Sequence, residues 1–98
     1  MIKIAIVEDH RATREGLETI INLSAGHKCV CTCGSAEEAL TILPLHRPEV
    51  VLMDIQLPNM SGVECVAQLK ELLPSVQVTV TVEPTWLMLT VASPLWSA

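Results

Sequence analysis

Two short runs of apolar residues, each ending in acidic side chains, place the strongest constraint on the fold. Ile2 to Val7 reads IKIAIV and stops at Glu8 and Asp9. Glu49 to Met53 reads EVVLM and stops at Asp54. Runs of this kind, rich in Val and Ile, are typical of strands that are buried on both faces of a parallel sheet. The rest of the chain must then supply the helices that cover such a sheet.

The segment after the first run has the pattern of a helix followed by a second strand. Residues 12–23 carry apolar side chains at helical spacing and charged side chains on the other side. The apolar ones are Leu17, Ile20 and Ile21, and the charged ones are Arg14, Glu15 and Glu18. The residues Ser-Ala-Gly at 24–26 end this helix, with Gly26 as its expected C-cap. Residues 28–33 are predicted to form the second strand.

Two capping boxes mark the starts of further helices. Ser35 with Glu38 begins a helix through about Leu43, followed by a loop over residues 44–48. A second box at 61 and 64 begins a helix that runs up to Pro74, and residues 76–82 follow as a fourth strand. The alternation of strands and helices predicts a doubly wound α/β sheet.

The length of the chain limits how many strand–helix units it can hold. Strands that begin near residues 2, 28, 49 and 76 imply about 25 residues for one unit, which agrees with the length that a crossover needs. Five units would need about 120 residues on this spacing. The 98 residues therefore form a single domain and are about one unit short.

Composition excludes several classes of function. Half of the residues are hydrophobic and 17% are charged, so the chain can bury a core. The net charge of −5 argues against nucleic-acid binding by this chain and is compatible with a cation site. There is no apolar leader, and the longest uncharged stretch, 84–98, is too short to span a bilayer. We expect a cytoplasmic protein that does not enter the membrane.

The cysteine residues raise the question of a metal site. Cys29, Cys31 and Cys33 alternate, so on a regular strand they would share one face, and Cys65 lies far from them in the sequence. Three neighbouring positions on one strand converge poorly on a tetrahedral soft metal. Buried, reduced cysteines are the better interpretation, and disulfides are not expected in this compartment.

The acidic residues at the two strand ends predict a second kind of site. If the first and third strands are neighbours, Glu8, Asp9 and Asp54 converge at the carboxyl edge of the sheet, where ligands bind in such folds. Carboxylates gathered in this way repel one another unless a cation neutralises them, and hard oxygen ligands suit Mg²⁺. His10 lies beside them and is interpreted as a solvated loop residue.

Two segments carry a family resemblance. IVEDHRATREGL, at 6–17, and VVLMDIQLPNMSGVE, at 50–64, resemble a bacterial response-regulator receiver domain. The similarity is greatest to receivers of the NarL/FixJ type, which precede a helix-turn-helix output domain, and it covers residues 2–78. The resemblance implies a flavodoxin-like parallel sheet with the strand order 2-1-3-4.

The resemblance also implies a chemistry for the acidic site. Asp54 would be the nucleophile that accepts a phosphoryl group from the phosphohistidine of a sensor histidine kinase. Asp9 and Asp54 would bind Mg²⁺, Glu8 would act through water, and the backbone carbonyl of Gln56 would supply a further oxygen. Phosphoryl transfer needs such a positioned nucleophile and a cation. Gly62 would allow a loop that a Cβ would hinder.

The sequence departs from the family pattern after about residue 78. The family places a Thr or Ser hydroxyl at the end of the fourth strand, where Val82 stands here, with Thr81 one residue away. LMLTV at 87–91 also resembles that strand, which would make Thr90 the hydroxyl. Thr81 and Thr90 therefore remain alternatives. The family lysine has no counterpart, because no Lys or Arg follows Lys70.

Because of these departures, we divide the chain into two parts and consider more than one function. Residues 1–78 form the receiver core, and 79–98 form an atypical segment in place of a fifth unit, through truncation or alteration. The leading hypothesis is a phosphoacceptor in two-component signalling that controls transcription within a longer protein.

The alternative is a degenerate receiver that acts only in protein interaction or dimerisation. An aspartyl phosphatase is disfavoured because Gln56 occupies the position of its general acid, so no enzyme is expected. The uncovered edge predicts a homodimer, with 87–91 exchanged or added there.

Overall fold

The computed structural model of this protein describes residues 1–82 and 87–91, with residues 81–82 and 87–91 described by their backbone alone. It contains one five-stranded sheet in the order β2-β1-β3-β4-β5. The first four strands run parallel, which confirms the predicted order 2-1-3-4. The strands are β1 (Ile2–Val7), β2 (His27–Cys33), β3 (Val50–Asp54), β4 (Gln77–Val82) and β5 (Leu87–Val91).

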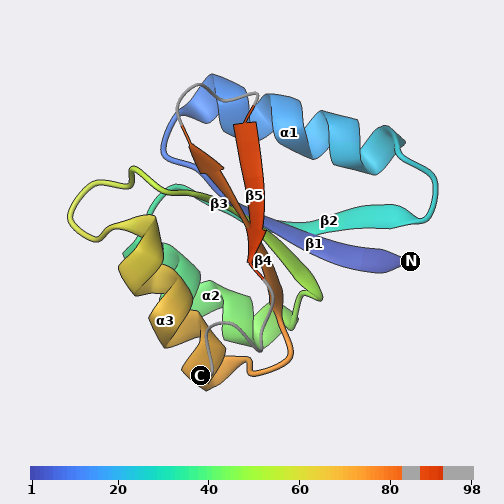
Figure 1. The fold of residues 1–98 in the computed structure, drawn as a ribbon. Coiled ribbons are helices and arrows are strands. Elements are labelled where there is room, and N and C mark those ends of the chain that lie inside the picture. Colours follow the sequence, from blue (N-terminus) through green and yellow to red (C-terminus); the bar gives the residue numbers. More distant parts are fainter. Residues whose placement is uncertain (83–86, 92–98) are drawn as a thin grey trace.

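Among the residues that the structure describes, three helices cover the sheet from two sides. Helix α1 (Arg11–Leu23) lies on one face, and α2 (Ala36–His46) and α3 (Gly62–Leu72) lie on the other (Figure 1). The larger core fills the space between the sheet and the pair α2–α3. Its largest fully buried side chains are aliphatic, as the scarcity of aromatic residues requires: Val7, Leu43, Val51, Met53, Val66, Leu69 and Val78.

Both predicted capping serines begin their helices. The hydroxyl of Ser35 accepts a hydrogen bond from the backbone N–H of Glu38 (3.1 Å), and that of Ser61 accepts one from Glu64 (3.2 Å). These bonds satisfy N–H groups that have no partner within the first turn of a helix. The sequence signal therefore located the starts of α2 and α3 correctly.

The expected loop from Pro44 is wrong, because α2 continues through the proline to His46. Proline cannot donate to the carbonyl four residues before it, but this loss falls in the last turn, where little helix follows. Leu43 is fully buried and anchors that turn. The helix ends at Arg47, which adopts a left-handed conformation (φ 48°) and donates its N–H to the Leu43 carbonyl.

Helix α1 also ends differently from the expectation. Its C-cap is Ser24, whose backbone N–H bonds the carbonyl of Ile21, and not Gly26. Gly26 lies two residues further on with a φ of +79°, a conformation that glycine adopts without strain. Its carbonyl accepts from the N–H of Ile2 (2.7 Å), so the turn leads directly into the pairing of β1 with β2.

A β-bulge in β2 separates the three cysteines that were expected to share a face. The register shifts between Ile4, which pairs with Cys29, and Ala5, which pairs with Cys31. An extra residue in one strand reverses the alternation of side chains beyond it. Cys29 consequently packs with the smaller cluster beneath α1, whereas Cys31 and Cys33 pack with the larger core on the opposite face.

Strand β5 lies antiparallel to β4 within the same chain. Val82 pairs with Leu87 and Val78 pairs with Val91, so the ladder runs the full length of β5. The sequence suggested that this segment is exchanged or added at the β4 edge, and here it is added in cis beside β4 (Figure 1). Among the described residues, no helix is long and apolar enough to cross a membrane.

Candidate functional site

The acidic residues that follow β1 and the one that ends β3 come together at one edge of the sheet. The two strands are parallel neighbours, with Val7 paired with Met53. One carboxylate oxygen from each of Glu8, Asp9 and Asp54 lies within 4.8 Å of the other two. Glu8 is buried, with 8% of its surface exposed, whereas Asp54 is half-buried and Asp9 is exposed. The predicted convergence of the three carboxylates is confirmed.

Within this cluster, the carboxyl of Glu8 has a raised pKa. Burial raises the pKa of its carboxyl from 4.5 to about 7, and hydrogen bonds with Asp54 and Asp9 and the charge of Asp54 raise this pKa as well. The backbone N–H of His10, which lies 3.1 Å from Oε2 of Glu8, opposes the shift and lowers the pKa. Burial and the neighbouring acids therefore both disfavour the ionised form of this carboxyl, and a nearby positive charge would favour it.

The donor set of this cluster fits a hard divalent cation. Three carboxylate oxygens at the mouth of a parallel sheet offer the ligands that Mg²⁺ prefers, and Mg²⁺ keeps several waters of its own. The pKa of Glu8 is raised first by burial and then by the neighbouring acids, so protonation relieves both the desolvation and the repulsion. A bound cation would supply the same relief without protonation.

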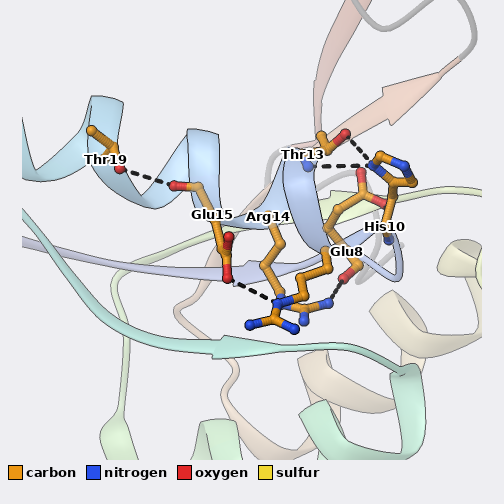
Figure 2. Close-up of polar contacts among 7 residues, drawn as sticks. Glu8, His10, Thr13, Arg14, Glu15 and Thr19 are labelled. Atoms are coloured by element: carbon orange, nitrogen blue, oxygen red, sulfur yellow. Dashed lines mark hydrogen bonds and ion pairs between the residues drawn. The ribbon is translucent and has the colours of Figure 1, made fainter.

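The first turn of α1 supports Glu8 from the backbone side, as Figure 2 shows. Nη1 of Arg14 donates to the Glu8 carbonyl (2.8 Å), so Arg14 ties α1 to the end of β1. Nδ1 of His10 lies 3.3 Å from the backbone N of Thr13 and 2.9 Å from its hydroxyl, which makes His10 the N-cap of the helix.

Arg14 was assigned to the charged outer side of the helix, and that assignment is wrong. Its side chain is half-buried, and a Cβ added to Gly34, beyond the end of β2, would lie 3.3 Å from its Nη1. The signal was present in the spacing, because Arg14 precedes the sheet-facing Leu17 and Ile21 by three and seven residues. His10 is exposed as expected, but its capping role was missed.

The loop after β3 is shaped by a close backbone contact at Gly62. A Cβ at this position would lie 2.6 Å from the carbonyl oxygen of Asp54 and 2.7 Å from Cα of Ile55. The N–H of Gly62 donates to the Ile55 carbonyl (3.0 Å), and Asn59 turns the loop through a left-handed conformation (φ 69°). The expectation that a Cβ would hinder this loop is confirmed.

The Asp54 side chain is oriented by the chain that follows it. The backbone N–H of Gln56 donates to Oδ1 of Asp54 (2.9 Å), an Asx-type bond across two residues. Gln56 itself is exposed. The role of its carbonyl as a metal ligand stays a prediction, as do the individual roles of the three acids.

The backbone register separates the two candidate hydroxyl residues. Thr81 is the Cα partner of Asp54 on the neighbouring strand β4. Thr90 pairs with Thr79, which in turn pairs with Leu52, so its backbone lies two strands and two residues away from Asp54. The register favours Thr81, and the choice between the two hydroxyls stays a prediction.

Lys70, the last Lys or Arg of the chain, holds the backbone at the end of the sheet that lies opposite the carboxylate cluster. Nζ of Lys70, near the end of α3, donates to the carbonyls of Pro74 (2.8 Å) and Val76 (2.6 Å). Desolvation by burial lowers the pKa of this ammonium group. Because these bonds hold the start of β4, Lys70 does not extend toward the carboxylates at the other end of β3.

The four cysteines behave as packed thiols. All four are free, with Cys33 and Cys65 buried and the other two half-buried. Burial raises the pKa of every thiol, to about 11 for Cys29 and about 12 for Cys33, so each stays protonated at neutral pH. Within the described part of the chain they join no metal-binding group of three or more residues.

Comparison with known proteins places these features in a family. Residues 4–87 match the family model of the response regulator receiver domain. The chain is 39% identical over 75 residues to a protein-glutamate methylesterase/protein-glutamine glutaminase of Nitrosospira multiformis, covering 76% of this chain and 21% of that protein. It is 34% identical over 79 residues to the transcriptional regulatory protein DegU of Brevibacillus brevis, covering 81% and 34%. The chain therefore spans about a third or less of the length of these relatives.

A solved structure has the same architecture. The two-component response regulator of the LuxR family from Aurantimonas sp. SI85-9A1 superposes with a TM-score of 0.76 at 26% identity, covering 81% of this chain and 56% of that one. The match of the family model spans most of the sequence, and it includes both strands that carry the acidic cluster. The chain belongs to the response-regulator receiver domain family.

Proposed function

We propose that this domain accepts a phosphoryl group on Asp54 from the phosphohistidine of a sensor histidine kinase. The observation that supports this most directly is the meeting of Glu8, Asp9 and Asp54 within 4.8 Å at the carboxyl ends of adjacent parallel strands. Phosphoryl transfer needs a positioned oxygen nucleophile beside a cation site, and this cluster offers both.

The chain's own residues would divide the work as follows. Asp54 presents a carboxylate oxygen to the phosphorus, held in orientation by the N–H of Gln56. Asp9 and Asp54 would bind Mg²⁺ directly, Glu8 through water, and the Gln56 carbonyl would complete the protein ligands. When bound, Mg²⁺ neutralises charge on the phosphoryl oxygens. Thr81, the register partner of Asp54, would supply the hydroxyl.

The wider role follows from the family. We infer a cytoplasmic signalling domain, with residues 1–78 as the receiver core and 79–98 as an atypical segment, that controls transcription as part of a longer protein. DegU, a relative of this chain, is a transcriptional regulatory protein. With a net charge of −5, the domain itself would not bind DNA, and it would act as a phosphoacceptor and not as an enzyme. A second copy of the domain is the other expected partner.

One observation favours a second function. Lys70 is the last Lys or Arg of the chain, and its ammonium group is held by two backbone carbonyls away from the acidic edge. A receiver without a cation from a later strand to pair with the phosphoryl group would hold it weakly. Such a domain would act through protein interaction alone.

Phosphorylation by a small donor separates these two functions. The domain is incubated with acetyl phosphate and Mg²⁺, and intact mass is followed over time. We expect a gain of one phosphoryl group that requires Mg²⁺, is abolished in Asp54→Asn and is retained in Glu71→Gln, an exposed carboxylate of α3. A wild-type domain that binds Mg²⁺ but never gains this mass would refute phosphoacceptance and support the interaction module.

A further inference from the structure

A groove lies at the end of the sheet where the parallel strands begin, opposite the carboxylate cluster. Its volume is about 700 Å³, within the range of pockets that bind ligands. The end of α2 with the loop to β3 forms one wall, and the end of α3 with the loop to β4 forms the other. We call it the basal groove, and its apolar lining residues are Ile2, Pro48, Val50, Leu72, Leu73 and Val76.

The apolar lining of the basal groove is partly open to solvent. Leu72 is 51% exposed and Ile2 is 40% exposed, although both are large apolar side chains. Exposed apolar side chains around a concave surface are typical of a binding site. Arg47 and Glu49 also line the groove, and their opposite charges offset each other. The groove therefore suits an occupant that is apolar and uncharged.

Hydrogen bonds hold the walls of the groove in place. Nζ of Lys70 donates to the carbonyls of Pro74 and Val76, which fixes the loop from α3 to β4. The N–H of Gln77 donates to the carbonyl of Glu49 (3.0 Å), which joins this loop to the start of β3. A groove whose walls are fixed in this way needs little rearrangement before it binds.

Strand β5 carries the chain to the same end of the sheet. Because β5 runs antiparallel to β4, its last residue, Val91, pairs with Val78 (Figure 1). Val78 directly follows Gln77, which lines the groove. The residues that follow β5 in the sequence therefore start beside the basal groove.

Those residues have the composition that the groove requires. Residues 92–98 read ASPLWSA and lie outside the described residues. They contain no charged side chain, and they include Leu95 and Trp96. Trp96 is five residues beyond Val91, a distance of up to about 17 Å in an extended chain.

We propose that residues 92–98 bind in the basal groove of their own chain, with the indole of Trp96 between the two walls. A tryptophan side chain that is buried in this way covers about 150–250 Å² of apolar surface. Ser75 and Gln77, which line the groove, offer oxygen acceptors for the indole N–H. The contact covers Leu72 and Ile2 without a second molecule.

The short connection to β5 makes even a weak contact effective. A segment tethered by a few residues has an effective concentration on the order of 1 mM at a neighbouring site. A contact with a dissociation constant of about 0.1 mM between separate molecules would then be about 90% occupied within one chain. The occupancy should not depend on protein concentration.

Full-length chains with a single tryptophan test this proposal, because the sequence contains no Tyr and only two Trp. Trp86→Phe leaves Trp96 as the only fluorophore, and its emission and its quenching by acrylamide are measured at about 1 µM and about 50 µM protein. We expect blue-shifted emission and severalfold weaker quenching than in the same chain unfolded in urea, equally at both concentrations. Trp96→Phe is the reciprocal chain. Its Trp86 precedes Leu87, which pairs with Val82 at the far end of β4.

A charge in the wall of the groove should release the segment. In the Trp86→Phe chain, Leu72→Glu should lower the ratio of bound to free segment by about 10-fold or more, so that about half or more of the chains expose Trp96. Val63→Glu is the matched control, because Val63 is 44% exposed on the same helix but lies in its first turn and outside the groove. It should leave Trp96 as protected as in the parent chain, and Leu72→Glu should not change the emission of Trp86 in the reciprocal chain.

Leu95→Glu guards against loss of folding, because it changes only the segment and should also expose Trp96. A Trp96 that is quenched as readily in the folded chain as in urea would overturn the proposal. So would protection that survives both Leu72→Glu and Leu95→Glu, or that is lost on dilution, because Trp96 would then bind another surface or the groove of a second copy. The inference does not rest on phosphoryl transfer, so Asp54→Asn should leave the emission of Trp96 unchanged.

Discussion

The buried carboxyl of Glu8 should make the stability of the domain depend on pH. Its pKa is about 7 in the folded domain against an ordinary 4.5, so the folded state holds the proton more tightly than the unfolded chain does. The group therefore contributes stability that is fully present below pH 4.5 and is lost as the pH rises through 7. A shift of this size corresponds to at most about 3 kcal/mol, and we expect about 1–3 kcal/mol after relaxation of the cluster.

Glu8→Gln isolates this contribution, because glutamine has nearly the same shape and no charge. Without Mg²⁺, the variant and the wild type should unfold in urea with similar free energies at pH 4.5, and the variant should be more stable by about 1–3 kcal/mol at pH 8. Mg²⁺ should stabilise the wild type at pH 8 far more than at pH 4.5, since protons and cation compete for the same oxygens. Glu71→Gln, on the surface of α3, should follow the wild-type profile. Wild-type and Glu8→Gln curves that run parallel between pH 4.5 and 8 would refute the reasoning.

Substitutions at three further positions test the supports of the site and of the sheet. Gly62→Ala should destabilise the domain by about 1–3 kcal/mol in urea unfolding and weaken Mg²⁺ binding, because its Cβ would lie 2.6 Å from the Asp54 carbonyl oxygen; unchanged stability would contradict this contact. Lys70→Met should cost about 1–3 kcal/mol because it removes the charged donor that Lys70 supplies to the Pro74 and Val76 carbonyls, and Lys70→Arg should recover part of it; equal losses in both variants would show that these hydrogen bonds do not matter. His10→Ala should cost about 1 kcal/mol in thermal unfolding by removing the N-cap of α1, whereas His10→Asn, which also caps, should retain most of it; an alanine variant as stable as the wild type would argue against the cap.

The sequence alone established the order of the elements and the place of the site. Apolar runs that end in Glu8, Asp9 and Asp54 predicted two neighbouring parallel strands and a carboxylate cluster between them. Ser35 and Ser61 located the starts of two helices. These signals are local, because a strand, a cap or a turn is specified by residues close together in the chain. The folded structure keeps these local features because the tertiary contacts favour the same conformations.

What the sequence could not determine depends on contacts between distant residues. The bulge opposite Ile4 and Ala5 moves Cys29 to the other face of the sheet, and only the pairing of β2 with β1 reveals it. The reach of Arg14 to the Glu8 carbonyl likewise needs α1 docked against the sheet. Helix α2 passes through Pro44 because the burial of Leu43 outweighs the loss of one hydrogen bond.

Strand β5, at the edge of the sheet, also shows this difference between what local sequence specifies and what tertiary contacts decide. The apolar run at 87–91 predicted a strand, but its direction and partner did not follow from its composition, and the fold places it antiparallel to β4. Register and direction are set by the whole set of neighbours that a strand meets, and a one-residue change turns every side chain to the other face. Local residues thus specify which elements form, and tertiary packing decides which atoms of those elements finally meet.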